Sequence, residues 1–309
     1  MAGTRVSYGA TVDIPHADLT VDEDLAARLV RAQFPALAGP VTPVAQGWDN
    51  ALFRLGDELA IRMPRREVAA HLIEHEQRWL PELQRLVALP LPVPIAEGRP
   101  TAGYPFAWSV IPWVDGIGGA HVSPHARDAY ARQLAGFLAA LHVPASADAP
   151  HNPVRGVPLV TRAAAIHARL DGLAGRLAAD ELAGLRAAWD AGAATAPHKG
   201  PALWLHGDPH PGNVVVAPSG RLATVVDFGD VTAGDPATDL AAAWLHFTPA
   251  GRAAFIERYS ELRATDAALW VRARAWAVSI GTSAFAASDG SGPMARMGRE
   301  AIEQLLRQD

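Results

Sequence analysis

One short segment in the second half of the chain constrains the fold more than any other. Polar and glycine residues run from His206 to Asn213 as His-Gly-Asp-Pro-His-Pro-Gly-Asn, and an Asp-Phe-Gly triplet begins at Asp227. Between them lie two apolar runs, 214–216 and 222–226, separated by the turn residues Pro-Ser-Gly. Such runs around a turn predict a β-hairpin, which brings the two polar loops together at its base.

The spacing of these polar residues indicates phosphoryl transfer. H-x-D-x-x-x-x-N followed by D-F-G is the spacing of the catalytic and metal-binding loops of protein kinases. The Asp208 carboxylate can orient and deprotonate an acceptor hydroxyl. Asn213 and Asp227 supply hard oxygen ligands of the kind that Mg²⁺ prefers, beside nucleotide phosphates. We therefore expect ATP or GTP as the phosphate donor and Mg²⁺ as the metal.

Two other interpretations of the same segment stay open. His206, Asp208 and His210 form H-x-D-x-H, which could bind a transition metal in a metal-dependent hydrolase. The chain could also be a catalytically silent nucleotide-binding scaffold. The hydrolase leaves Asn213 and Asp227 without a role, so the phosphotransferase is favoured. ATP consumption that depends on an added hydroxyl compound would separate it from both alternatives.

The first half of the chain predicts a small antiparallel sheet with two helices. One helix is expected over Val21–Phe34, and a second over 67–86 with a kink or break at Pro81. Strands are expected at 42–44, 51–55, 59–63, 95–97 and 106–111.

The expected nucleotide-binding residues lie on this sheet and its second helix. Arg62 follows Ala-Ile on a strand, where kinases carry a phosphate-pairing lysine, and its guanidinium can grip phosphate oxygens bidentately. Helical spacing places Glu76 in the buried arc with Val68 and Trp79, so we expect Glu76 to pair with Arg62. Gly47 lies in the turn between the first two strands, where backbone N–H groups could cover phosphates. No G-x-x-x-x-G-K-[ST] motif occurs, which excludes a P-loop.

The rest of the chain predicts a mainly helical second lobe. A Gly-rich crossing at 112–119 is interpreted as a hinge between an N-terminal nucleotide-binding lobe, 1–111, and a C-terminal lobe, 120–309, that carries the catalytic loop and the acceptor site. The fold class is therefore α+β, with a small antiparallel-sheet lobe and a larger helical one. Helices are expected at 124–142, 159–177, 180–194, 249–262, 266–287 and 293–306, with one further strand at 203–205.

Composition excludes several classes of function. The 309 residues include 27 Lys and Arg against 32 Asp and Glu, so a nucleic-acid partner is not expected. The absence of Cys excludes disulfides and thiol chemistry. No signal peptide is recognised at the start, and the longest apolar stretch carries Arg272 and Arg274, so neither a membrane span nor a membrane partner is expected. A cytoplasmic location is the expectation.

Three motifs resemble the aminoglycoside phosphotransferase family, across roughly residues 40–290. They are the loop H-G-D-x-H-P-G-N, the D-F-G-D that follows, and G-D-P-A-T-D-L-A at 234–241. The resemblance implies a kinase-like phosphotransferase acting on antibiotics or other small hydroxylated molecules. It implies Asp208 as the base, Asn213 and Asp227 as Mg²⁺ ligands, and Asp239 as a carboxylate that steadies the catalytic loop. It also implies that the backbone from Val110 to Val114 meets adenine.

Charge in the expected acceptor region does not favour a polycation. Acidic and basic residues nearly balance over 143–205 and over 250–309. A polycationic aminoglycoside would prefer surplus carboxylates, so an antibiotic of modest charge is at least as good a candidate. An acidic pocket could still arise from Glu257, Glu261, Asp266 and Asp289. Aromatic surface for an acceptor, or simply core, is expected from Trp189, Trp244, Trp270 and Trp276.

Overall fold

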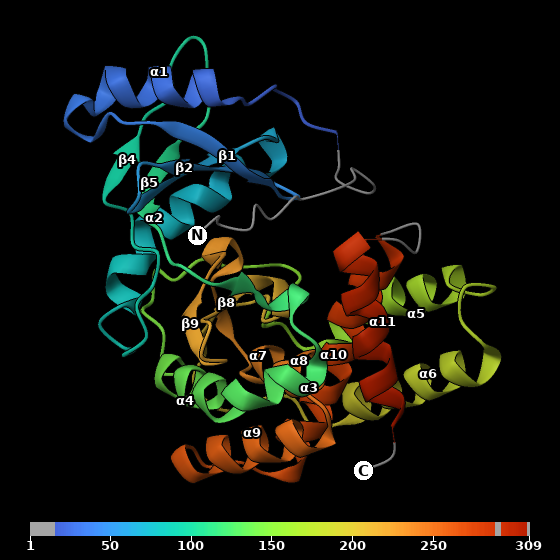
Figure 1. Cartoon of the computed structure of the whole chain (residues 1–309). Helices are drawn as coiled ribbons and strands as arrows, with labels where there is room; N and C mark the ends of the chain where they lie inside the picture. The colour runs from blue at the N-terminus through green and yellow to red at the C-terminus, as the bar shows by residue number, and fades with distance from the viewer. Residues whose placement is uncertain (1–15, 288–291, 308–309) are drawn as a thin grey trace.

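The computed structural model describes residues 16–287 and 292–307, which form a sheet-based N-terminal part and a larger helical part (Figure 1). The sheet is antiparallel, with strand order β1-β2-β3-β5-β4. The leader expected before the first helix falls largely at 1–15, outside the described residues. The strands are β1 (Val41–Gln46), β2 (Asn50–Leu55), β3 (Leu59–Pro64), β4 (Ala96–Gly98) and β5 (Trp108–Pro112).

Alternation along the central strands sets the two faces of the sheet. Ala51, Phe53 and Leu55 of β2 are buried, and the intervening residues are half-buried. The turn to β3 places Gly56 at φ +58°, which glycine adopts without steric cost. On β3, Ile61 is fully buried, and its neighbour Arg62 points to the opposite face. Because side chains alternate along a strand, Arg62 points away from the apolar core that Ile61 enters. The helix α1 (Glu23–Gln33) packs on that core face of the sheet.

The second helix, α2 (Ala70–Leu83), connects the two parts of the molecule. A 3-10 helix, η2 (Glu67–Ala69), precedes it, and Pro81 lies inside it without splitting it. The expected burial of Val68 was wrong: its side chain is 65% exposed because the α-helix begins two residues later. Trp79 packs against Trp204, with ring centroids 4.9 Å apart. Trp79 and its neighbours on α2 therefore belong to the core of the helical part.

The helical part surrounds one large apolar core. The expected helix at 124–142 is interrupted by the 3-10 helix η4 (Asp128–Tyr130), where the Asp128 side chain accepts a hydrogen bond from Thr248 N at 3.0 Å. The helices are α3 (Pro124–Arg127), α4 (Ala131–Leu141), α5 (Ala163–Gly172), α6 (Ala179–Ala194), α7 (Ala237–Leu240), α8 (Ala242–His246), α9 (Pro249–Leu262), α10 (Ala267–Ala286) and α11 (Gly292–Leu306).

Short strands inside the helical part hold the loops that the motifs predict. The expected hairpin is present as β8 (Val214–Val216) and β9 (Leu222–Val225). β7 (Leu203–Leu205) pairs with β10 (Thr232–Gly234), and β6 (Ile117–Gly118) pairs with β8. The sequence did not predict β6, β10, α7 or α8. Because β6 pairs with the hairpin, the expected linker at 112–119 ends within the helical part.

Within the described residues, no helix combines the length and apolar character needed to cross a membrane.

A buried ion pair holds α10 against the loop after β10. Arg272 Nε lies 2.7 Å from Asp235 Oδ2, and both side chains are only 8% exposed. Removing one partner of such a pair leaves the other charge buried and uncompensated. Asp235→Ala should lower the free energy of unfolding by about 3–5 kcal/mol, measured by urea denaturation.

The matched control is Asp171→Ala, because Asp171 pairs with Arg186 at the surface and is 69% exposed. We expect a loss of less than about 1 kcal/mol there. Equal losses in the two variants would contradict the assigned role of the Asp235–Arg272 pair.

Candidate active site

The polar loop at 206–213 leaves β7 through a turn that requires glycine. Gly207 has φ +91°, and a Cβ atom there would lie 2.3 Å from the backbone oxygen of Asp230. Any other side chain would collide with that backbone. The loop is thereby pressed against the Asp-Phe-Gly-Asp segment, which places Asp208 beside it.

Asp239 fixes the same turn from the protein interior. Its carboxylate accepts hydrogen bonds from His206 N at 2.7 Å and from Gly207 N at 2.9 Å. His142 Nε2 lies 3.2 Å from Asp239, which is itself fully buried. Since buried N–H groups need acceptors, Asp239 determines where the loop begins.

His206 supports the loop and cannot also bind a metal through its ring. Its Nε2 lies 2.9 Å from the Val226 carbonyl oxygen, and its Nδ1 accepts a hydrogen bond from Asp208 N at 3.2 Å. Both ring nitrogens are therefore occupied. The described residues also contain no group of three His, Asp or Glu side chains placed to hold a metal ion. The H-x-D-x-H metal triad of the hydrolase interpretation is not assembled.

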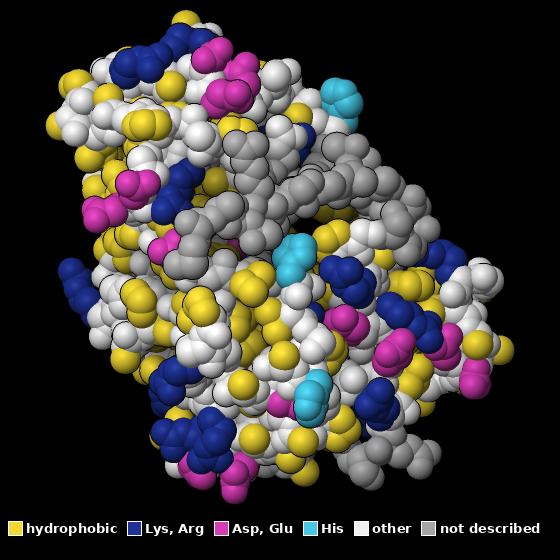
Figure 2. Space-filling view, in the orientation of Figure 1, with side chains coloured by type: hydrophobic (Ala, Val, Ile, Leu, Met, Phe, Trp, Pro, Cys, Tyr) yellow, Lys and Arg dark blue, Asp and Glu magenta, His cyan; other side chains and the backbone are white. Residues whose placement is uncertain are grey.

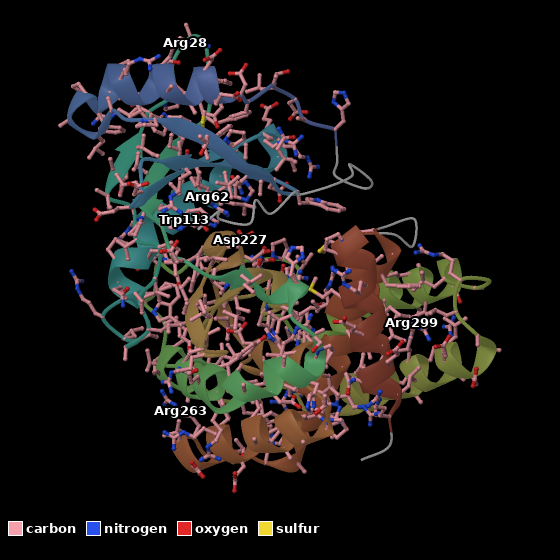
Figure 3. The ribbon with its side chains drawn as sticks, in the orientation of Figure 1. Arg28, Arg62, Trp113, Asp227, Arg263 and Arg299 are labelled. Carbon is pink, nitrogen blue, oxygen red and sulfur yellow. The ribbon has the colours of Figure 1, made fainter. Side chains whose placement is uncertain are left out.

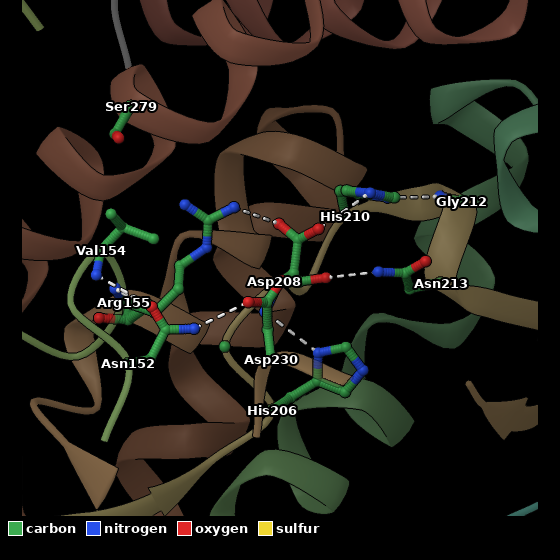
Figure 4. Close-up of polar contacts among 12 residues, drawn as sticks. Asn152, Val154, Arg155, His206, Asp208, His210, Gly212, Asn213, Asp230 and Ser279 are labelled. Carbon is green, nitrogen blue, oxygen red and sulfur yellow. Dashed lines mark hydrogen bonds and ion pairs between the residues drawn. The ribbon is translucent and has the colours of Figure 1, made fainter. Parts of the chain in front are cut away.

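The Asp208 carboxylate lies between two cationic groups (Figure 4). Arg155 Nη2 is 3.1 Å from Oδ1, and His210 Nε2 is 3.3 Å from Oδ2. Burial alone would raise the pKa of Asp208, but the charges of His210 and Arg155 outweigh it and hold the pKa well below its usual range. Conversely, Asp208 raises the pKa of His210 despite the burial of the ring. Asp208 is thus ionised and ready to accept a hydrogen bond.

Sequence reasoning missed Arg155. It follows Asn152, whose side-chain oxygen accepts hydrogen bonds from Val154 N and Arg155 N at 2.9 and 3.1 Å. The Asn152 amide also donates to Asp230 Oδ1 at 2.7 Å. The only sequence signal was an Asn-Pro turn pair at 152–153, which does not show where the next side chains point.

The hairpin brings Asn213 and Asp227 to its base. Val214 and Val225 are paired across β8 and β9, and Val226 N donates to Asn213 O at 2.9 Å. The Asn213 amide nitrogen donates to Asp208 O at 2.9 Å, which leaves the amide oxygen available. Asp227 adopts φ +64°, a left-handed conformation that is rare for residues other than glycine. Its carboxylate is 44% exposed.

Arg62 reaches this carboxylate from the sheet (Figure 3). Its Nη2 donates to Asp227 Oδ1 at 2.5 Å, and its Nε lies 2.8 Å from Glu76 Oε2. The predicted Arg62–Glu76 ion pair is confirmed. Glu76 also accepts a hydrogen bond from Phe228 N at 2.9 Å. Burial raises the pKa of Glu76 to about 7, although Arg62 acts in the opposite direction.

The other predicted nucleotide-binding residues surround the sheet edge. Gly47 N donates to Asn50 O at 2.8 Å, so this N–H closes the β1–β2 turn. Val114 follows β5 and Trp113, whose N–H donates to Glu58 O at 2.8 Å. No described residue accepts a hydrogen bond from the Val114 N–H. A role for either residue in nucleotide binding stays a prediction.

The acceptor features expected from sequence lie elsewhere. Trp189, Trp244 and Trp276 are buried in the core. Glu257 and Glu261 both bind Arg132 and lie on α9, at the end of the molecule far from the sheet (Figure 1). The remaining residues do not complete an acidic pocket: Asp266 caps α10, Asp289 is outside the described residues, and Trp270 packs edge-on against Tyr259.

Comparison with known proteins agrees with this arrangement. A family model described as "Phosphotransferase enzyme family" matches residues 40–276. No curated protein sequence matches the chain. The GDP complex of aminoglycoside 2'-phosphotransferase-IIIa is similar in structure, with a TM-score of 0.66, 18% identity, and coverage of 92% of this chain and 98% of that one.

Two further solved structures share the fold. Macrolide 2'-phosphotransferase MphH from Brachybacterium faecium has a TM-score of 0.58 and 20% identity, and covers 93% of this chain and 98% of its own. The streptomycin-ATP-APH(2")-IIa ternary complex has a TM-score of 0.58 and 16% identity, and covers 86% of this chain and 89% of its own. The architecture is thus that of the kinase-like phosphotransferases.

The anchoring role of Asp239 is testable without a substrate. Asp239→Asn keeps the shape but removes one acceptor, so either His206 N or Gly207 N loses its partner. The free energy of unfolding should fall by about 1–3 kcal/mol, and amide exchange should accelerate at His206 or at Gly207. Asp190→Asn, at an exposed position on α6, is the control. Unchanged exchange at both His206 and Gly207 would contradict this account of the loop.

Proposed function

The chain belongs to this phosphotransferase enzyme family, and we propose that it transfers the γ-phosphate of ATP or GTP to a hydroxyl group of a small molecule. The single observation that carries the proposal is the convergence of Asp208, Asn213 and Asp227. The catalytic-loop and hairpin hydrogen bonds hold all three at one end of β8 and β9. Arg62 faces them from the sheet, where the donor phosphates would pass between the two parts of the molecule.

The proposed reaction needs a proton acceptor and an aligned phosphate. Asp208 accepts the proton of the acceptor hydroxyl, and the hydroxyl oxygen forms a bond to the γ-phosphorus. The bond from the γ-phosphorus to the oxygen that bridges the β- and γ-phosphates breaks, and the nucleoside diphosphate leaves. Arg155 and His210 hold the Asp208 carboxylate in place for this step, at 3.1 and 3.3 Å. Because its pKa is lowered, Asp208 acts mainly by orienting the hydroxyl until the bond to phosphorus forms.

The residues present suit Mg²⁺. The Asn213 amide oxygen and the half-exposed Asp227 carboxylate are hard oxygen ligands, and the amide oxygen is left available by the hydrogen bond that its nitrogen makes. Asn213 and Asp227 would hold the ion. When bound, Mg²⁺ supplies charge neutralisation on the phosphate oxygens of the donor. We expect Arg62, which contacts Oδ1 of Asp227, to move away from it when the ion binds, and Glu76 keeps the guanidinium beside the site.

We propose a hydroxylated antibiotic or a similar small molecule of modest charge as the acceptor. Two structures of the same fold carry antibiotic names, an aminoglycoside and a macrolide phosphotransferase. Glu257 and Glu261, which the sequence offered for an acidic acceptor pocket, pair with Arg132 instead, and this removes one reason to expect a strongly cationic acceptor. A screen of ATP and GTP turnover over antibiotic and sugar-alcohol acceptors, with ³¹P detection of the product, tests the assignment. ATP consumption that no hydroxyl compound stimulates would indicate the silent scaffold.

Replacing the proposed base separates catalysis from nucleotide binding. Asp208→Ala should lower kcat by about 10²- to 10⁴-fold, because a positioned base contributes an effect of that size. The dissociation constant for Mg²⁺-nucleotide, measured by calorimetric titration, should stay within about threefold of the wild-type value, since Asp208 faces the acceptor. Wild-type turnover in this variant would eliminate the mechanism.

Replacing the proposed metal ligand Asp227 should affect nucleotide binding, which the Asp208 variant leaves unchanged. Asp227→Ala should abolish the Mg²⁺ dependence of nucleotide binding, because Asn213 alone is a poor site for the ion. Titrations with and without Mg²⁺ measure this directly. Asp230→Ala is a matched control, since Asp230 belongs to the same turn but binds Asn152. A Mg²⁺ effect of wild-type size in Asp227→Ala would show that the ion is held elsewhere.

A further inference from the structure

Four arginines recur at intervals of seven residues along the segment that enters and forms α5. They are Arg155, Arg162, Arg169 and Arg176. Arg162 ends the 3-10 helix η5 (Leu159–Arg162), and α5 begins at the next residue. Seven residues correspond to about two helical turns, so Arg162 and Arg169 lie on one face. In this row of arginines the helical spacing aligns only Arg162 and Arg169, whereas Arg155 precedes the helical segment and reaches the catalytic loop through its ion pair with Asp208.

The first and third members of this row fix its position beside the active site. Arg155 binds Asp208 at 3.1 Å, and Arg169 Nη1 donates to the backbone oxygen of Ser279 on α10 at 2.7 Å. Figure 4 shows Ser279 on the same side of Asp208 as Arg155, opposite Asn213. This is the acceptor side, because Asn213 marks the proposed metal and nucleotide side.

The charges of the row affect one another. Burial lowers the pKa of Arg162 and of Arg169, and the positive charge of Arg155 lowers each of them further. Arg162 also lowers the pKa of Arg169. The positive charges of these three guanidinium groups therefore oppose one another. Arg176 is directed elsewhere: it stacks on Phe285 at 4.6 Å and donates to the Phe285 backbone oxygen at 2.9 Å.

Asp208 compensates the charge of Arg155, but no described carboxylate pairs with Arg162 or Arg169. No ion pair or hydrogen bond joins Arg162 to any described residue, and its Nε is buried without an acceptor. Arg155 Nε is likewise buried without an acceptor. Arg169 binds only neutral oxygens, those of Ser279 and Thr282. Buried donors of this kind are normally satisfied by a ligand or by water.

Acidic residues on the surrounding helices bind other partners. Figure 2 shows Asp and Glu interleaved with Lys and Arg over the region of α5, α6 and α11. The pairs within the described residues are Asp171 with Arg186, Glu181 with Arg299, Asp190 with His167, and Glu300 with Arg127. None of these carboxylates neutralises Arg162.

We propose that the acceptor carries an acidic group, a carboxylate or a phosphate, that Arg162 binds while the acceptor hydroxyl lies at Asp208. This inference rests on the proposed phosphotransferase function and narrows its substrate class. The guanidinium fork matches both acid groups bidentately. A polycationic acceptor would be repelled by the positive charge of these arginines and is therefore disfavoured.

Calorimetric titration of small anions tests the site without knowledge of the natural acceptor. Mg²⁺-ADP is first titrated into the enzyme, which tests the nucleotide site by itself. Sulfate and D-glycerate are then titrated into the ADP-saturated enzyme as phosphate-like and carboxylate probes, with glycerol as the uncharged comparison. If ADP does not bind, the proposed function fails, and the anion titration is carried out on the free enzyme.

The wild-type enzyme should bind at least one anion saturably and more tightly than glycerol. Arg162→Gln should weaken that binding about tenfold, Arg162→Lys should restore part of it, and none of these changes should alter the affinity for Mg²⁺-ADP. The control Arg186→Gln, on the exposed face of α6, should bind as wild type does. The more strongly affected probe identifies the acid group. Anion binding that is no tighter than that of glycerol, or that is equal in wild type and Arg162→Gln, overturns the proposal.

Discussion

The guanidinium group of Arg62 connects the sheet, the second helix and the loop that follows the hairpin. Arg62 on β3 contacts Glu76 of α2 at 2.8 Å and Asp227 at 2.5 Å, while Glu76 also binds the backbone of Phe228. Burying any of these charges alone would cost several kcal/mol. Because each requires the others, the Asp-Phe-Gly turn, α2 and the sheet take up a single relative arrangement. The guanidinium thereby contacts Oδ1 of the carboxylate in the proposed metal site, and we propose that donor binding rearranges this contact.

The catalytic side is positioned by a separate set of contacts. Asp239 orients the start of the loop, Gly207 allows its close approach to the Asp-Phe-Gly-Asp turn, and the Asn213 side chain bonds to the backbone of Asp208. These contacts come from buried residues, so Asp208, the proposed base, is held in position before any substrate binds. Arg155 is the exception, since it comes from a surface turn. In the proposal above it connects the proposed base to the arginine row, so that the charge of the acceptor would act on the environment of Asp208.

Much of this site was predictable because its signals are local. The H-x-D-x-x-x-x-N and D-F-G spacing predicted the hairpin that joins Asn213 and Asp227, and helical periodicity predicted the Glu76 partner of Arg62. The predictions failed where contacts between residues remote in sequence determine the local structure. β6 and β10 are two and three residues long and exist only through pairing with β8 and β7. The burial of Val68 depended on a helix start that no capping residue marks. Arg155 lies in an aperiodic turn whose direction is set by Asp230 and Thr238, which are remote in sequence.

The central claim is that Arg62 and the proposed metal–nucleotide complex compete for Asp227. A crystal structure of the chain with Mg²⁺ and a non-hydrolysable triphosphate analogue tests it most directly. The account predicts the ion on Asn213 and Asp227, and the Arg62 guanidinium turned from Asp227 to a phosphate oxygen while it keeps its contact with Glu76. An Arg62–Asp227 contact that persists beside a bound nucleotide, or an ion held by other residues, would contradict it.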